Sequence, residues 1–292
     1  MSLLRDDLSI ITWVGQDGVR HPLTGGLAAA DPKHGVKLKS IKGVGGPFKH
    51  LDQQGARQDG VDWLAAYFDP AEIDMKISVE GYTNSDRRRV YRSWLNGWTP
   101  FAQGRLSWFT VDLGEWWMML RQLNTLTSDI PGGHLRTWEL DWQARADLPF
   151  WQSFPSTSSL RASSATKLVD PTGINPANYC PLFNRGDVAG WPEYLAQGPG
   201  TFTFGDNGSL TSQRQISIKL KAGEVVLLKT LPRIRSATEI NSNADVYPRL
   251  KNRFSQPIEA GAAVHVPVAV TGATAGITSV KAKLTPFRRW PE

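Results

Sequence analysis

Alternation between apolar and polar residues at every second position most restricts how this chain can fold. Five segments follow this pattern, residues 73–79, 138–144, 216–220, 264–270 and 280–284. Successive side chains of a β-strand point to opposite faces, so a period of two predicts strands with one buried and one solvent-exposed face. Glycine, asparagine and proline turns separate many of the short strands. The sequence therefore predicts a mainly β protein.

Only one segment has the spacing of a convincing helix. Apolar residues recur there three and four positions apart, at Val90, Tyr91, Trp94, Leu95 and Trp98. Asn84 or Ser85 can cap its start, and Gly97 ends it. Four arginines predict a basic, solvated face on this helix: Arg87, Arg88, Arg89 and Arg92.

Tryptophan content and charge divide the chain near Trp151. Ten of the 12 tryptophans lie at or before this residue, and the net charge is −1 up to it and +7 after it. Two regions of different composition are most simply two domains. We predict a first domain over residues 1–155, a mixed β-sheet with one helix. The second region, residues 156–292, comprises a linker and a β-sandwich of short strands; the serine-rich stretch at residues 153–165 is the linker.

Residues 184–200 are dense in glycine and proline and enclose a predicted strand at residues 191–196, the first of the second domain. They also contain Arg185-Gly186-Asp187, a tripeptide that some secreted proteins present to receptors. Gly-Asp is an ordinary turn sequence, and nothing at residues 1–7 has the pattern of an export signal. We therefore interpret the tripeptide as part of a turn.

No catalytic, cofactor-binding or metal-binding residue can be assigned. The histidines are far apart in the sequence, and Cys180 is the only cysteine. The glycine-rich residues 43–47 lack the Gly-Lys-Ser/Thr ending of a phosphate loop. Carboxylate pairs such as Asp59 with Asp62 are interpreted as turn and surface residues. No apolar run is long enough to span a membrane, so we expect a soluble product made in the cytoplasm, without membrane insertion.

A group of basic residues in the second region has two interpretations. Its members are Arg233, Arg235, Arg249, Lys251 and Arg253. Clustered cations can attract an anionic polymer such as a cell-envelope glycan or nucleic acid. The alternative, a solvated or subunit-facing surface, is the one we favour.

Several short motifs together resemble a known family. They are Leu-Pro-Phe-Trp at residues 148–151, Asn-Arg-Gly-Asp-Val-Ala-Gly-Trp-Pro at 184–192, Gly-Pro-Gly at 198–200, Gly-Glu-Val at 223–225 and the loop at 257–261. With the order of the predicted domains, they resemble the distal tail proteins of siphophages, in the form of the minor tail proteins of actinobacteriophages. One departure is Lys229-Thr230, where the family often has an acidic residue.

The resemblance implies a structural protein of the virion tail tip, assembled in the host cytoplasm. In this family an N-terminal belt domain forms a hexameric ring, and a galectin-like β-sandwich lies outside it. The expected partners are further copies of the chain, the tail tube, tail-tip hub and tape-measure proteins, and receptor-binding proteins; DNA passes through the lumen. The family has no catalytic residues and no cofactor.

Two other functions stay open. The second domain could be a carbohydrate-binding module that attaches the virion to host cell-wall glycans, because fold alone does not settle function. An enzyme acting on the cell wall would need a pair of catalytic carboxylates, which the sequence does not single out.

Overall fold

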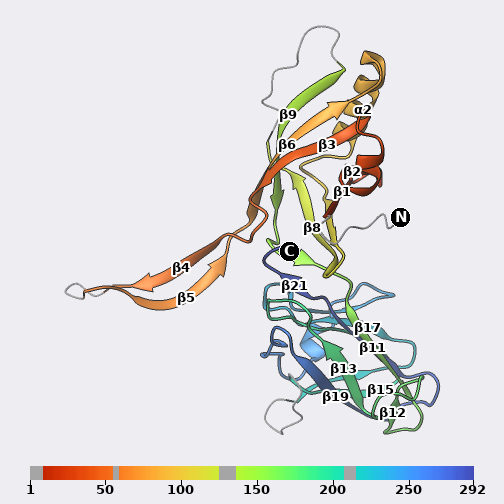
Figure 1. Ribbon diagram of the computed structural model, residues 1–292. Helices are drawn as coiled ribbons and strands as arrows, with labels where there is room; N and C mark the ends of the chain where they lie inside the picture. Colours follow the sequence, from red (N-terminus) through yellow and green to blue (C-terminus); the bar gives the residue numbers. More distant parts are fainter. Residues whose placement is uncertain (1–8, 55–58, 125–135, 207–214) are drawn as a thin grey trace. The chain divides into compact units, whose positions relative to one another are not determined.

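The computed structural model describes residues 9–54, 59–124, 136–206 and 215–292 (Figure 1). The chain in these ranges is mainly β, as predicted. Residues 1–7, considered above for an export signal, lie outside them. None of the helices in the described ranges has the length and hydropathy needed to cross a membrane.

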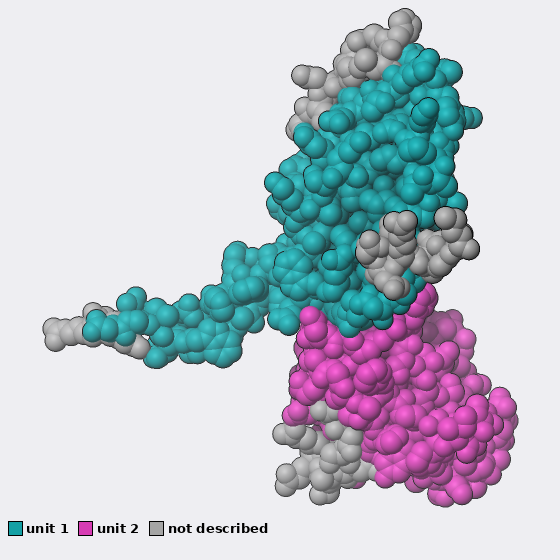
Figure 2. Space-filling view, in the orientation of Figure 1, with its two compact units in different colours: residues 1–153, 288–292 teal, residues 154–287 magenta. Residues whose placement is uncertain are grey.

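The chain divides into two compact units, residues 1–153 with 288–292 and residues 154–287 (Figure 2). The second unit is therefore an insertion in the first, because the chain returns to the first unit for its last five residues. We predicted two successive domains, with those five residues in the second. They belong to the first unit instead.

The first unit is built on one curled sheet. Its strands, in the order in which they pair, are β2 (Arg20–Thr24), β1 (Ile10–Val14), β7 (Gly104–Thr110), β8 (Gly114–Gln122), β9 (Thr137–Ala146), β6 (Ala71–Glu80) and β3 (Gly35–Lys42). β10 (Trp151–Gln152) pairs with β8. The edge strands β2 and β3 pack against each other, so the sheet curls around the core. We predicted a mixed sheet, and this is wrong: every pairing along the path is antiparallel.

Helix α2 (Asn84–Asn96) covers this core through tryptophan contacts. Trp94 and Trp98, from the helix and its end, meet Trp13 of β1 and Trp142 of β9, and the rings of Trp13 and Trp98 stack 3.7 Å apart. The N-cap is Thr83, which precedes both predicted caps, because its Oγ1 accepts the N–H of Asp86, the third helical residue.

Two further details of the first unit differ from the prediction. A second, short helix, α1 (Gly26–Ala30), is present; one turn is too short to show a helical period in the sequence. Arg87 does not belong to the basic face of α2, because its side chain is buried with the guanidinium 5.6 Å from the centre of the Trp138 ring.

Strands β4 (Phe48–Gln53) and β5 (Asp62–Phe68) form a separate two-stranded sheet in the first unit. This hairpin, called the arm below, extends away from the rest of its unit (Figures 1 and 2). Every side chain of β4 is exposed, and so are all of β5 except one. At about 3.3 Å per residue the arm reaches about 20 Å.

The second unit is the predicted two-sheet sandwich. One sheet pairs its strands in the order β12 (Leu168–Val169), β11 (Ser156–Ala162), β20 (Ser279–Leu284), β14 (Glu193–Gln197), β17 (Val225–Lys229) and β18 (Ser236–Glu239). The other pairs β13 (Tyr179–Phe183), β19 (Ala263–Thr271), β15 (Gly200–Phe204) and β16 (Ile216–Leu220). The short segments of this unit are η1 (Pro232–Ile234) and η2 (Tyr247–Arg249), while β21 (Phe287–Arg288) spans the boundary between the units in the sequence and pairs with β10. Buried residues of both sheets, such as Tyr194 and Phe202, form one core.

The linker prediction for residues 153–165 is wrong, because β11 lies inside this range and pairs along its length with β20. Its core-facing positions are Ser158, Leu160 and Ala162, so only one large apolar side chain marks its buried face. The predicted strand at residues 191–196 exists as β14. It is not the first strand of the unit, however, and it lies between β20 and β17.

Glu239, at the end of β18, provides a test of the second unit's stability. Its buried carboxylate accepts hydrogen bonds from the hydroxyl and the N–H of Ser242 and from the N–H of Asn241, and these lower its pKa from 4.5 to about 2. A depressed carboxyl pKa stabilises the folded state above the unfolded-state pKa, and this contribution is lost as the pH falls through the folded-state pKa.

We therefore expect Glu239→Gln to lower the thermal unfolding midpoint at pH 7, with the difference from the unchanged protein shrinking between about pH 4.5 and pH 2. Calorimetry across this pH range measures it. A difference that stays constant with pH would contradict the assignment.

Candidate functional site

The arm carries aromatic side chains along one side. Phe48 and Phe68 are paired at its base, with ring centres 6.4 Å apart, and the rings of Phe48 and His50 meet edge to face at 5.3 Å. Farther out, the Trp63 indole donates a hydrogen bond to Nδ1 of His50 at 3.2 Å. We call these four residues the aromatic face of the arm.

A β-bulge places Trp63 on this face. In the register of the hairpin Leu51 pairs with Ala65, but Asp52 pairs with Trp63, so Leu64 is the extra residue. Strict alternation would have put Leu64 on the same side as Phe68. The aromatic content of residues 61–68 was the only sign of this face in the sequence. The strand register that aligns the rings could not be predicted from the sequence.

The aromatic face is exposed in the single chain. Trp63 and Phe48 are 63% and 59% accessible, and Leu51 and Tyr67 on the same hairpin are exposed as well. A two-stranded hairpin is marginally stable at best in water, and monomeric proteins rarely expose large contiguous apolar patches. The arm therefore has the properties of a surface that another protein covers.

A cavity of about 420 Å³ lies elsewhere in the first unit, bordered by β2, α1, β3 and α2. Arg20, Lys37 and Arg89 are among its lining residues. His21 also lines it; burial lowers the pKa of this histidine, and its ring packs edge to face on Trp94.

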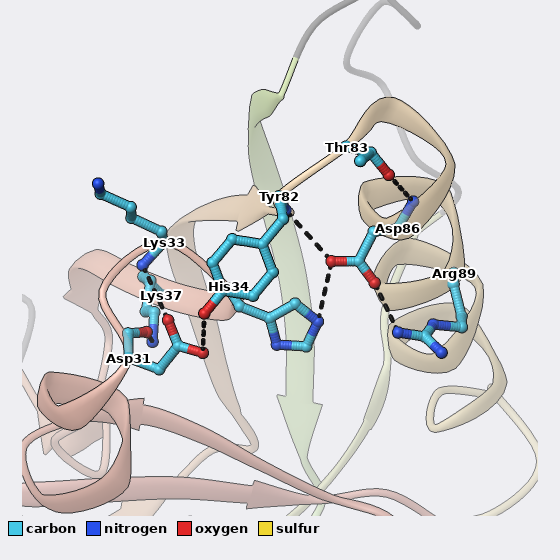
Figure 3. Close-up of polar contacts among 8 residues, drawn as sticks. All are labelled: Asp31, Lys33, His34, Lys37, Tyr82, Thr83, Asp86 and Arg89. Atoms are coloured by element: carbon cyan, nitrogen blue, oxygen red, sulfur yellow. Dashed lines mark hydrogen bonds and ion pairs between the residues drawn. The ribbon is translucent and has the colours of Figure 1, made fainter.

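Polar contacts join three segments at the rim of this cavity (Figure 3). Asp86 accepts hydrogen bonds from Arg89 and from the Tyr82 N–H and lies 3.3 Å from His34 Nε2. The Arg89 hydrogen bond is the main cause that lowers the pKa of Asp86. The Tyr82 hydroxyl donates to Asp31 at 2.8 Å, which raises the pKa of Tyr82.

These contacts stabilise the start of α2 and the end of α1. Asp86 and Thr83 together cap the start of α2, and the Lys37 ammonium donates to the Ala28 and Asp31 carbonyls at the end of α1. Burial lowers the pKa of Lys37. The carboxylates and cations of this network form hydrogen bonds with backbone groups at the helix ends and ion pairs with each other. Among these residues no nucleophile lies next to a base.

The structure does not gather the four histidines of the described ranges into one site. His21 and His34 lie at the cavity, His50 lies on the arm, His265 lies on β19, and His134 is outside the described residues. Across the described ranges no group of three or more His, Cys, Asp or Glu side chains could hold a metal ion. Cys180 is buried, and burial raises its pKa to about 12.

The basic group of the second unit is partly neutralised within the chain. Arg249 pairs with Glu224 at 2.9 Å and donates to the Lys219 carbonyl. Arg233, Lys251 and Arg253 are exposed, while Arg235 is half-buried. This arrangement agrees with a solvated surface and does not define an anion site.

The Arg-Gly-Asp tripeptide lies in a tightly packed turn. Asn184 is buried and holds the turn, because its amide donates to the Val188 and Ile258 carbonyls and its Oδ1 accepts the Gly186 N–H. A Cβ on Gly186 would lie 2.1 Å from the Phe287 carbonyl oxygen, so only glycine fits.

Solved structures of phage proteins share this fold. The SPP1 Dit (gp 19.1) protein, titled a paradigm of hub adsorption apparatus in Gram-positive infecting phages, aligns with a TM-score of 0.59 at 11% identity, over 96% of this chain and 99% of its own. A chain of the phage P2 baseplate in its activated conformation with Ca aligns with a TM-score of 0.57 at 10% identity, over 97% and 99%. No family model and no curated protein matches the sequence.

The fold is therefore that of phage Dit and baseplate chains over nearly the whole length of the protein. This confirms, for the fold, the resemblance to siphophage distal tail proteins drawn from the sequence.

The packing at Gly186 generates a test that separates folding from receptor binding. We expect Gly186→Val to destabilise the second unit, because its side chain would overlap the backbone at Phe287. Asp187→Glu, which destroys the tripeptide but keeps the charge, should leave the unfolding midpoint close to that of the unchanged protein. If Gly186→Val stayed fully stable and only binding to cells were lost, the receptor interpretation would be favoured.

Proposed function

We propose that the protein is a structural, non-enzymatic component of a phage tail tip that assembles with copies of itself into a ring. The observation that carries this proposal is the exposed aromatic face of the arm. The likeness to a hub protein and to a baseplate chain supports the location in the virion tail.

We propose that the arm of one copy contacts a different surface of the next copy. An arm that reaches from one copy to a different surface on the next makes a head-to-tail contact, and such contacts close into a ring when the rotation between copies allows it. Six copies is the number that the family resemblance implies. The tail tube, hub, tape-measure and receptor-binding proteins are the further partners that we propose on the same basis, with DNA passing through the lumen.

Energetically, the aromatic face is suited to be the centre of the interface. Large aromatic side chains dominate the free energy of many protein interfaces, and truncating such a residue commonly costs about 2 kcal/mol or more. Phe48 and Trp63 are both exposed on one side of a hairpin that has little else to stabilise it.

A second function has its own observation. Tyr179 and Phe183 are exposed on β13 and share one side of that strand, four residues apart, beside His265 of the paired strand β19. Exposed aromatic rings on a sandwich sheet can stack on sugar rings, so the carbohydrate-binding alternative is tested at these two residues. Saturable binding of the full chain to host cell walls, lost in Tyr179→Ala with Phe183→Ala, would favour this function.

For the ring, we expect Trp63→Ser to weaken self-association by roughly 30-fold or more at each interface, because about 2 kcal/mol of aromatic contact is removed. Native mass spectrometry at several concentrations measures the distribution of oligomers. Phe101→Ser is the matched control, since Phe101 is in the same unit and 92% exposed but lies off the arm. A protein that remains a monomer, or a ring unaffected by Trp63→Ser, contradicts the proposal.

A further inference from the structure

The last five residues, Arg288–Glu292, lie along the first unit and are anchored at both ends. The Arg288 guanidinium lies 4.5 Å from the centre of the Trp116 ring, a favourable cation–π arrangement. At the other end a carboxylate oxygen of Glu292 accepts a hydrogen bond from the Ser9 hydroxyl at 2.9 Å. The segment is thus a strap across the unit and has defined contacts at each end.

Between its anchors the strap meets the root of the arm. The Arg289 carbonyl accepts the Gly46 N–H at 3.3 Å. The Trp290 ring lies directly on Gly45, where a Cβ would be 2.5 Å from the ring. Glycine at position 45 is therefore required for the ring to lie against the backbone.

The same root is held from the body of the unit. The Trp151 indole donates to the Val44 carbonyl at 2.7 Å, and the Asp69 N–H donates to the Pro47 carbonyl at 3.0 Å. The glycine-rich residues 43–47 are thus packed on two sides. Since β4 begins at the next residue, these contacts fix the direction in which the arm leaves the unit.

Trp290 also extends the apolar surface of the arm. Its side chain is 57% exposed, and with Phe48 and Pro47 it lines an open groove of about 520 Å³. The indole therefore packs on the arm root and borders the same groove as Phe48, the first residue of the aromatic face.

We infer that the C-terminal strap is part of the self-association surface: it fixes the arm at its root and adds Trp290 to the apolar face that a second copy covers. This inference rests on the proposed self-association. The inference gives a role to residues 288–292, which belong to the first unit although they follow the second in the sequence. The partner is a second copy of this chain, whose apolar contact would seat against Trp290 as well as against the arm.

Two substitutions in the full-length chain test the strap from opposite sides. Trp290→Ala removes the ring, and Gly45→Ala keeps it but places a methyl group where the ring lies. For both we expect about tenfold faster hydrogen exchange at the Gly46 and Asp69 amides and about tenfold weaker self-association by native mass spectrometry. Trp290→Phe, which keeps an aromatic ring, should restore much of both properties.

The outcomes separate this inference from the proposed ring. If both variants still form the ring, the inferred role of the strap is overturned, whether or not hydrogen exchange becomes faster. The proposed ring would not be contradicted by that result. If hydrogen exchange is unchanged while self-association is weaker, the strap does not position the arm, and the inference as stated is overturned. If the protein without substitutions does not self-associate, the proposed function is contradicted. The hydrogen-exchange data would still show whether the strap fixes the arm. An unchanged circular dichroism spectrum excludes global unfolding of the variants.

Discussion

The four-tryptophan cluster of Trp13, Trp94, Trp98 and Trp142 is the interaction on which the first unit depends. It joins the first strand, the main helix and the strand that pairs with β6 through ring contacts of 3.7–6.4 Å. An aromatic side chain buries about 150–250 Å², so at about 25 cal/mol per Å² each ring contributes roughly 4–6 kcal/mol of transfer free energy before entropy is counted. Because the cluster fixes α2, it also fixes the capping network around Asp86.

Tryptophan is used for two purposes in this unit. Eight of the ten early tryptophans are buried within the chain, whereas Trp63 is exposed on the arm and Trp117 is half-buried. Most of the tryptophan rings are therefore inside the unit, and the proposed self-association would use a small set of rings on the arm together with Trp290.

The second unit is inserted between two segments of the first, so the last residues of the chain belong to the first unit. The chain leaves after Ser153, forms a complete sandwich with its own core, and returns for the strap. A strap that continues directly from the sandwich gives the first unit two covalent connections to the second.

The sequence by itself determined the mainly β character, the main helix and most of the strands, because period two and period 3.6 depend only on which residues face a core. It also supported the two compositional regions and the resemblance to distal tail proteins. It could not reveal β11, whose buried face carries serine and alanine around Leu160. Only the tertiary structure decided the bulge that aligns Trp63 with His50, and the return of Trp290 to Gly45 across more than two hundred residues. Both depend on pairings between distant segments, and local patterns do not encode such pairings.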